Sequence, residues 1–110
     1  MQEDSTKLEM RKGLLLLAVL RVVSHKRMYA AEILEALASS EFATQEGTLY
    51  PLLSRIKRDG LIEHEWEESA SGPPRKYYRL SNEGTLRMKE LMKHISTLRK
   101  DLNQLGGNHE

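Results

Sequence analysis

The first apolar stretch of the chain is an unbroken run, LLLLAVL, at residues 14–20. It lies within a helix predicted from about Lys7 to Val23, and a helix with such a run presents apolar groups on every side. A helix of this kind has to be covered all round, which a chain of 110 residues struggles to do alone. The pattern therefore indicates that a partner chain covers part of this helix.

A second helix is predicted over residues 30–39, where one apolar stripe is formed by Ile33, Leu34 and Leu37. The polar residues between the two apolar segments mark the boundary between the helices. Phe42 lies in the short connection that follows, and we expect its ring to cap the core.

The stretch EGTLYPLLSRIKRDGL, at residues 46–61, predicts a third helix with an unusual start. Its apolar face is spaced i, i+3, i+4 and i+7 and consists of Leu49, Leu52, Leu53 and Ile56. Thr44 is expected to be the N-cap, and Gly60 followed by Leu61 predicts a Schellman stop. If the helix starts near Gly47 or Thr48, Pro51 lies at about the third or fourth helical position, where it removes at most one hydrogen bond.

A β-hairpin is predicted after the third helix. LIEHEWEE, residues 61–68, alternates with period 2, and RKYYRL, residues 75–80, is its expected partner. The segment SASGPP, residues 69–74, is turn-forming. On the first strand we expect Trp66 to lie in the core and His64 to be a half-exposed structural residue.

The last helix is predicted from about Asn82 to Leu105, with Ser81 or Asn82 as its N-cap. Its apolar residues follow a strict heptad spacing of 3, 4, 3, 4 and 3: Met88, Leu91, Ile95, Leu98, Leu102 and Leu105. This seam fits either a helix lying on its own core or a dimer arm. The apolar first helix, with Leu14 and Leu17, favours the dimer arm.

The order of the elements is helix, helix, helix, hairpin and long helix, which is the arrangement of a winged helix-turn-helix. The expected fold class is mainly α (α+β), with three N-terminal helices, a two-stranded β-wing and a long C-terminal dimerisation helix. We expect a winged helix-turn-helix DNA-binding domain at residues 7–80 and the dimerisation helix at residues 81–105.

Composition excludes several classes of protein. The chain has no cysteine, so disulfides and thiolate metal ligands are ruled out, and its four histidines show no metal-binding spacing. No nucleophile, phosphate-loop or dinucleotide motif occurs, so we expect neither an enzyme nor a cofactor. The apolar run is too short to span a bilayer and lacks a cleavage site, which favours a cytoplasmic protein with no membrane contact.

The net charge of +1 gives no basic footprint overall, but basic residues gather on the third helix and on the hairpin. Acidic residues of the first strand, such as Glu63 and Glu67, are expected to pair across the hairpin with Arg75 or Arg79. Such pairs would remove some of the basic groups from contact with DNA. Charge alone therefore does not decide the function.

The face of the third helix opposite its leucines carries small, hydroxyl and basic residues, which suits a helix that meets DNA with its first turns. Free N–H groups at the helix start attract phosphate, while the hydroxyls and arginines can reach phosphates or base edges. The candidate DNA contacts here are Thr44, Gly47, Thr48, Tyr50, Pro51, Ser54, Arg55 and Arg58. At the hairpin, where basic groups can enter a minor groove or hold the backbone, they are Ser71, Gly72, Arg75 and Lys76. Alternatively, Pro51 only shapes a surface helix and the arginines are solvated.

These residues resemble a known family. The stretch EGTLYPLLSRIKRDGLIEHEWEESASGPPRKYYRLSNEG, residues 46–84, is similar to the PadR family of bacterial transcriptional regulators, and RKGLLLLAVL and MYAAEILEAL resemble its first two helices. The resemblance covers about residues 10–92. Ala30 departs from the glycine that the family commonly has there, and the single C-terminal helix resembles a smaller subgroup.

The resemblance implies a homodimeric regulator, usually a repressor, whose last helices cross and pack on the partner's first helix. Some members of the family bind flat aromatic compounds at the dimer interface, so a small-molecule effector is a further possible partner. Two functions remain open: a dimeric repressor of double-stranded DNA with an inverted-repeat operator, and a winged helix that binds a protein.

Overall fold

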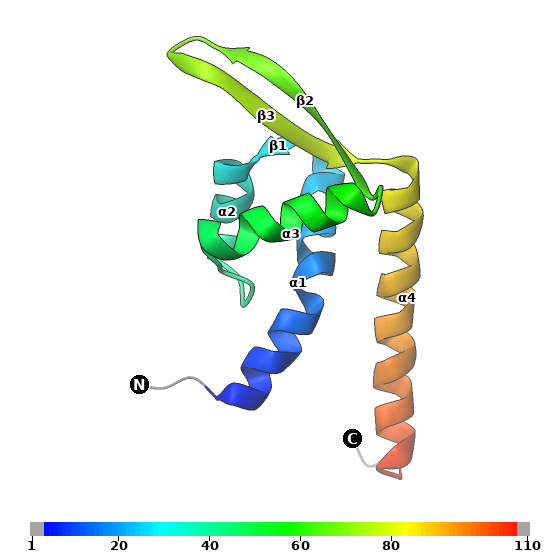
Figure 1. Ribbon diagram of the computed structural model, residues 1–110. Coiled ribbons are helices and arrows are strands. Elements are labelled where there is room, and N and C mark those ends of the chain that lie inside the picture. Colours follow the sequence, from blue (N-terminus) through cyan, green and yellow to red (C-terminus); the bar gives the residue numbers. More distant parts are fainter. Residues whose placement is uncertain (1–3, 108–110) are drawn as a thin grey trace.

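The structure is a computed structural model and describes residues 4–107. The elements in chain order are α1 (Ser5–His25), β1 (Met28–Tyr29), α2 (Ala30–Ala38), α3 (Glu46–Arg58), β2 (Ile62–Ser69), β3 (Gly72–Leu80) and α4 (Asn82–Leu105). The expected mainly α winged helix-turn-helix is confirmed, and the β2–β3 hairpin, called the wing below, projects beyond the helices (Figure 1). Each helix begins and ends within two residues of its expected bounds.

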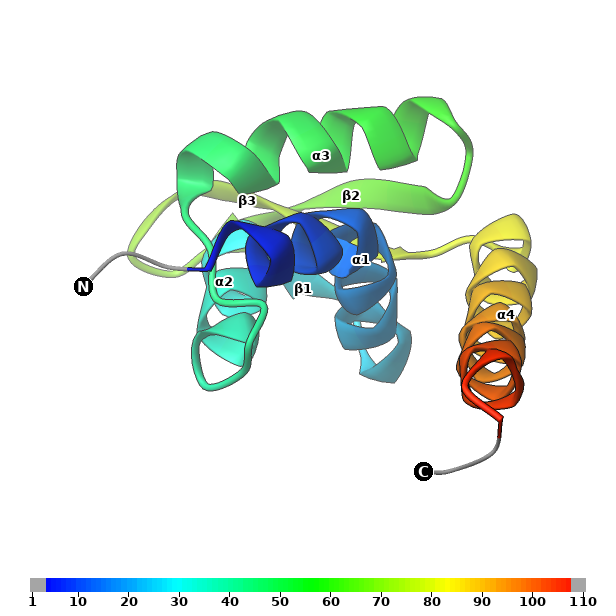
Figure 2. The ribbon, with the colours of Figure 1, turned by 90° about the horizontal axis from the view of Figure 1, so that it is seen from below.

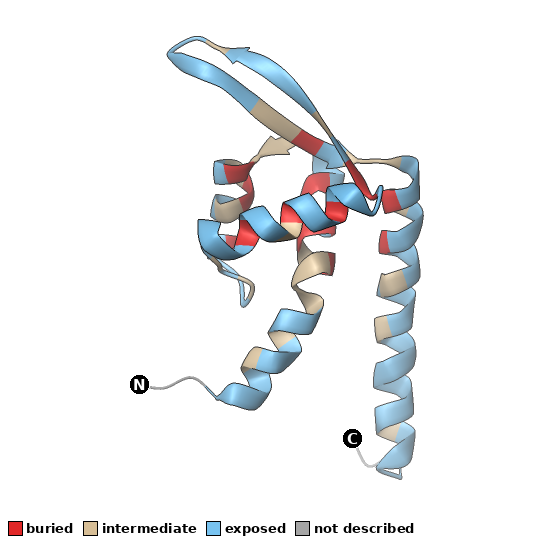
Figure 3. Ribbon diagram, in the orientation of Figure 1, coloured by how far each residue is buried: buried red, intermediate tan, exposed pale blue. Residues whose placement is uncertain are grey.

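The core lies where α1, α2 and α3 meet beneath the base of the wing (Figure 3). Its largest fully buried side chains come from all three helices: Val19, Leu20, Ile33, Leu49, Leu53 and Ile56. Phe42 and Leu34 pack against this cluster and are partly buried, as the sequence predicts. Burying each such side chain stabilises the fold by about 2 kcal/mol. This burial fixes α3 on α2 and leaves the opposite side of α3 exposed.

The sheet has three strands in the order β1-β3-β2, so β3 is central. The sequence did not predict β1, because its two residues carry no periodicity of their own. They pair antiparallel with β3, Met28 opposite Tyr78 and Tyr29 opposite Tyr77. This short strand ties the connection between α1 and α2 to the base of the wing.

Two expectations for the wing were wrong. The turn is shorter than residues 69–74, because Ser69 pairs with Gly72 and the two prolines lie inside β3. Trp66 is not in the core, since 63% of its surface is exposed. Along the same face of β2, Ile62 is buried, His64 is half-buried and Trp66 is exposed, because the hairpin extends beyond the helices that cover its base.

The start of α3 differs from the expectation, and its end agrees. Gln45, not Thr44, is the N-cap. The helix begins at Glu46, earlier than the expected start near Gly47 or Thr48, so Pro51 is the sixth helical residue rather than the third or fourth. Proline has no N–H to donate to the carbonyl four residues earlier, so one ladder bond is missing in the first half of α3. At the other end Gly60 has a φ of 78°, and Leu61 N donates to Ile56 O at 3.1 Å, which completes the predicted Schellman motif.

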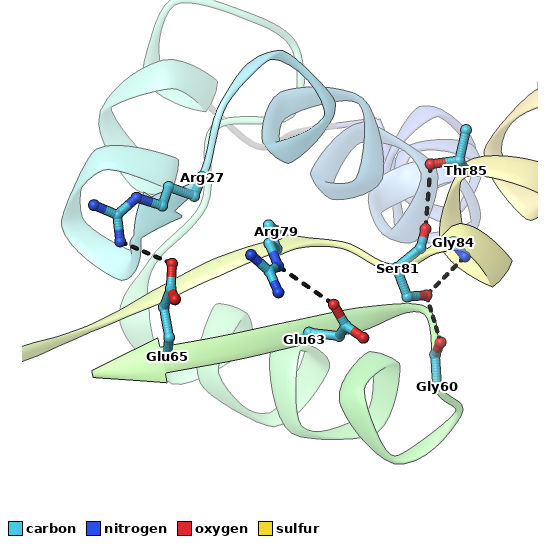
Figure 4. A network of polar contacts seen from close by, with 8 residues as sticks. All are labelled: Arg27, Gly60, Glu63, Glu65, Arg79, Ser81, Gly84 and Thr85. Carbon is cyan, nitrogen blue, oxygen red and sulfur yellow. Dashed lines mark hydrogen bonds and ion pairs between the residues drawn. The ribbon is translucent and has the colours of Figure 1, made fainter. Parts of the chain in front are cut away.

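Ser81 joins the end of α3, the base of the wing and the start of α4 (Figure 4). Its hydroxyl donates to Gly60 O at 2.6 Å and accepts from Gly84 N at 2.9 Å, so it is the N-cap of α4. Its own N–H donates to Leu61 O at 3.1 Å. A Cβ on Gly84 would lie 1.9 Å from that same Leu61 oxygen, so only glycine fits there.

Replacing Gly84 with Ala is therefore expected to lower the free energy of unfolding by about 3 kcal/mol, because overpacking against rigid backbone is costly. Chemical denaturation followed by circular dichroism measures the change. The matched control is Gly13→Ala in α1, where an added Cβ meets nothing within 4 Å and should stabilise the helix by about 0.5–1 kcal/mol. An equal gain for both variants would contradict the close contact at Gly84.

Candidate nucleic-acid interface

The outer face of α3 is exposed and, apart from Glu46 in its first turn, free of acidic residues. Residues 47–58 contain no carboxylate, and the predicted contacts on this helix are exposed: Gly47, Thr48, Tyr50, Pro51, Ser54, Arg55 and Arg58. Thr44 differs from them, because it is half-buried ahead of the helix and lines a hollow against the first turns of α1. The α2–α3 pair is thus a helix-turn-helix whose second helix presents a neutral-to-basic surface.

The structure divides the predicted contacts of α3 between two grooves. Tyr50 and Ser54 face the wing, whereas Thr48 and Arg55 face α1 and α4. With 3.6 residues per turn, Gly47, Pro51 and Arg58 follow the ridge between these two sides. The sequence could place all these residues on one face but not show which neighbour each of them meets.

The groove between α3 and the wing, called the α3–wing groove, has a volume of about 400 Å³. Its floor and walls are mostly aromatic and apolar, and its rim is basic: Tyr50, Tyr78, Trp66, Pro74, Arg75 and Lys76. No carboxylate lines it. Trp66, expected in the core, belongs to this site, and the sequence pattern signals only its place on the hairpin.

Three acidic side chains of β2, Glu63, Glu65 and Glu67, lie on the opposite face of the wing, where they pair with cations. Glu63 pairs with Arg79 at 3.3 Å, as expected. Glu65 and Glu67 pair instead with Arg27 from the end of α1, whose guanidinium lies 2.9 Å from Glu65 Oε1 (Figure 4). The expected pair with Arg75 is absent from residues 4–107.

The basic groups at the α3–wing groove are held by aromatic rings. The guanidinium of Arg75 lies 4.5 Å from the ring centroid of Tyr29, and Lys76 Nζ lies 5.2 Å from that of Trp66. Such cation–π contacts orient a charge without neutralising it. In the described part of the chain neither residue forms an ion pair, so both charges stay available to an anion. Ser71 and Gly72 lie further out, at the hairpin tip, and do not line the groove.

His64 reports the positive potential at this site. Burial lowers the pKa of its imidazole, and the charges of Lys57 on α3 and Lys76 on the wing lower it further. Its Nδ1 atom is buried without a hydrogen-bond partner in the structure. His64 thus lies between a cation of α3 and a cation of the wing.

A second groove, the α1–α4 groove, has a volume of about 680 Å³, and its lining is mostly apolar with basic side chains such as Arg55 and Arg87 among it. It contains several of the predicted dimerisation residues, and its apolar lining includes Leu14, Leu17, Leu52, Leu91, Ile95 and Leu98. Met88 is buried at its upper end. Beyond it α4 runs away from the body (Figures 1 and 2), and Leu102 and Leu105 of the seam are 68% and 83% exposed.

Two other kinds of site are not seen in residues 4–107. No group of three or more His, Asp or Glu side chains is placed to hold a metal ion there. None of the helices over the same range combines the length and apolarity needed to cross a membrane.

Comparison with known proteins agrees with this geometry. The profile of the transcriptional regulator PadR-like family matches residues 19–90. A PadR-like transcription factor from Bacteroides fragilis is 39% identical, with a TM-score of 0.80 over 93% of this chain and 99% of that one. A PadR family regulator from Eggerthella lenta is 33% identical, with a TM-score of 0.84 over 92% and 88%. A PadR-like regulator from Bacillus cereus is 32% identical, with a TM-score of 0.78 over 88% and 95%.

The cationic surface makes a prediction for His64. Replacing Lys57 or Lys76 with Gln is expected to raise the pKa of His64, because a nearby positive charge disfavours the imidazolium. Titration of the imidazole C–H signals by NMR measures this pKa. Lys93→Gln on α4 is the control, since that lysine contributes nothing to the shift. If neither Lys57 nor Lys76 moved the pKa, the two lysines would not act on this site.

Proposed function

The chain belongs to the PadR-like family of transcriptional regulators, and we propose that it is a homodimeric repressor that binds an inverted-repeat operator. It is a DNA-binding regulator of transcription, as its family is. In the proposed complex α3 enters the major groove and the wing holds the flank. A small molecule or another signal relieves repression, and the protein acts in the cytoplasm, beside the bacterial chromosome.

The observation that carries the proposal is that α3 and the wing share one acid-free surface. Tyr50 and Ser54 of α3 line the same groove as Arg75 and Lys76 of β3. Glu63, Glu65 and Glu67 of β2 are paired on the far face. Phosphate contacts supply most of the affinity of a DNA-binding protein, and they require available cations on one continuous face. The fold provides that face.

The residues divide the work of binding. The exposed start of α3, from Gly47 to Pro51, brings the backbone and the positive end of the helix dipole close to a phosphate. Arg55 and Arg58 reach phosphates or the edge of a guanine in the major groove. Arg75 and Lys76, with Ser71 and Gly72 at the tip, lie on the flanking backbone or in the minor groove.

The dimer is proposed from the half of α4 that the single chain leaves uncovered. The heptad seam continues past the body through Leu98, Leu102 and Leu105, and the α1–α4 groove beside it is mostly apolar. A second copy of α4 fits the seam by heptad pairing and also covers the apolar first helix. The proposed interface thus accounts for both apolar surfaces with one partner, and its two-fold symmetry requires an inverted repeat with half-sites about 10 bp apart.

The same interface would let a bound small molecule affect the DNA-binding helix α3. Thr48 and Arg55 of α3 line the α1–α4 groove together with the seam residues Leu91 and Ile95. A compound bound between α1 and α4 would therefore touch α3 directly. This arrangement supports relief of repression by a small molecule at the dimer interface.

Removing one arginine from each proposed contact tests DNA binding. Arg55→Ala and Arg75→Ala are each expected to weaken binding to the protein's own promoter on the order of tenfold. Gel shifts over a range of salt concentrations measure the loss, and the log–log salt slope should fall by about 0.9 for each phosphate contact removed. Arg79→Ala is the matched control, because it removes a wing arginine that is paired with Glu63 on the far face. Unchanged gel shifts for both variants would favour a protein partner over DNA.

Charges placed in the seam test the dimer. The double variant Ile95→Asp, Leu98→Asp is expected to be a monomer in sedimentation experiments, because two carboxylates per chain cannot be buried without partners. The control is Ser96→Asp with Thr97→Asp, which adds the same charges at exposed positions of α4 outside the seam. A dimer that survives the first variant would refute the seam as the interface.

A further inference from the structure

We infer that Trp66 contacts DNA: its indole forms a platform for the sugar–phosphate backbone of one strand, which passes through the α3–wing groove beside Lys76. This inference rests on the proposed function and adds to it a contact that is neither basic nor at the hairpin tip. The occupant of the groove is the backbone of duplex DNA.

The exposure of Trp66 has no explanation in the packing of the chain. The ring is 63% exposed on β2, whereas Tyr78, which lies opposite His64 on the same face and nearer the base of the wing, is buried. An exposed indole leaves a large apolar area in water and contributes little to the stability of the fold. Its only ring contacts in the described chain are an edge-on contact with His64, at 6.4 Å between centroids, and the Lys76 ammonium.

The chemistry around the ring matches a nucleic-acid backbone. Trp66 and Pro74 offer apolar surface for a deoxyribose ring, and Lys76 Nζ lies 5.2 Å from the indole centroid, where an adjacent phosphate would meet it. Arg75 lies on the same rim, and no carboxylate lines the groove. An alternation of apolar and cationic groups complements an alternation of sugar and phosphate.

The position of the groove also fits this occupant. If α3 lies in the major groove and the wing lies on its flank, the strand that separates the two has to cross between them. Tyr50 and Ser54 stand on one side of that path and Trp66 and Lys76 on the other. An indole with only two side-chain torsions loses little entropy on contact, so the platform adds affinity for any sequence.

The chain has one tryptophan, so its fluorescence reports on this contact alone. The unmodified full-length protein is titrated at low salt with a fluorescently labelled duplex of random sequence, because a backbone contact needs no operator. Anisotropy of the label measures binding, and tryptophan emission with acrylamide quenching measures the surroundings of Trp66. We expect the emission to change at the same DNA concentration as the anisotropy, and the acrylamide quenching constant to fall at least twofold.

Substitutions of Trp66 measure the contribution of its ring to DNA affinity separately from any effect on folding. Trp66→Ala should weaken binding about fivefold or more, as for a central aromatic contact, while Trp66→Phe keeps a flat ring and should recover most of the affinity. Because Trp66 is exposed, neither substitution is expected to unfold the protein, and circular dichroism checks that both variants stay folded. Glu68→Ala is the control for a change on the same strand outside the groove.

The outcomes distinguish this inference from the proposed function. If the duplex binds but emission and quenching of Trp66 stay as in the free protein, the inference is overturned and the proposed repressor stands. If Trp66→Ala binds as tightly as the unmodified chain, the platform is likewise overturned. If the unmodified protein binds no duplex even at low salt, the proposed function itself fails.

Discussion

The hydroxyl of Ser81 bonds at once to Gly60 O and to Gly84 N, and the geometry of the whole molecule depends on this junction. Gly60 follows the C-cap of α3, Ser81 follows the last residue of β3, and Gly84 lies in the first turn of α4. Three elements with different tasks therefore meet within a few ångströms. A single N-cap fixes the direction of α3 relative to both the wing and α4. The close packing of Gly84 against the Leu61 carbonyl holds the start of α4 in place.

In the proposed dimer this junction determines the distance between two DNA-reading helices. The seam of α4 sets how two copies meet, and α4 is anchored to α3 through Ser81 rather than through a flexible linker. A small change in the crossing of the two α4 helices would therefore move both copies of α3 as rigid bodies. Thr48 and Arg55 of α3 line the α1–α4 groove, so in the proposed mechanism a compound bound there would also shift α3.

Long periodic segments and local stop signals were predictable from the sequence, whereas features set by distant neighbours were not. Heptad spacing gave α4 its bounds, and Gly60 with Leu61 gave the end of α3, because both patterns are local. The strand β1 exists only because β3 lies beside it. Alternation placed Trp66 on the inward face of the wing, but nothing local shows that the wing extends beyond the helices. The candidate contacts on α3 were found as one face, and the two grooves that divide them depend on tertiary packing.

The strand order β1-β3-β2 leaves one side of β2 without a neighbour in the described sheet. Such an edge offers free N–H and C=O groups to any extended chain and invites aggregation by strand addition. Here the edge carries Glu63, Glu65, Glu67 and Glu68, so a second wing approaching edge to edge would bring its own row of carboxylates against them. In the proposed dimer, these acidic residues would keep two wings on the same duplex from pairing edge to edge.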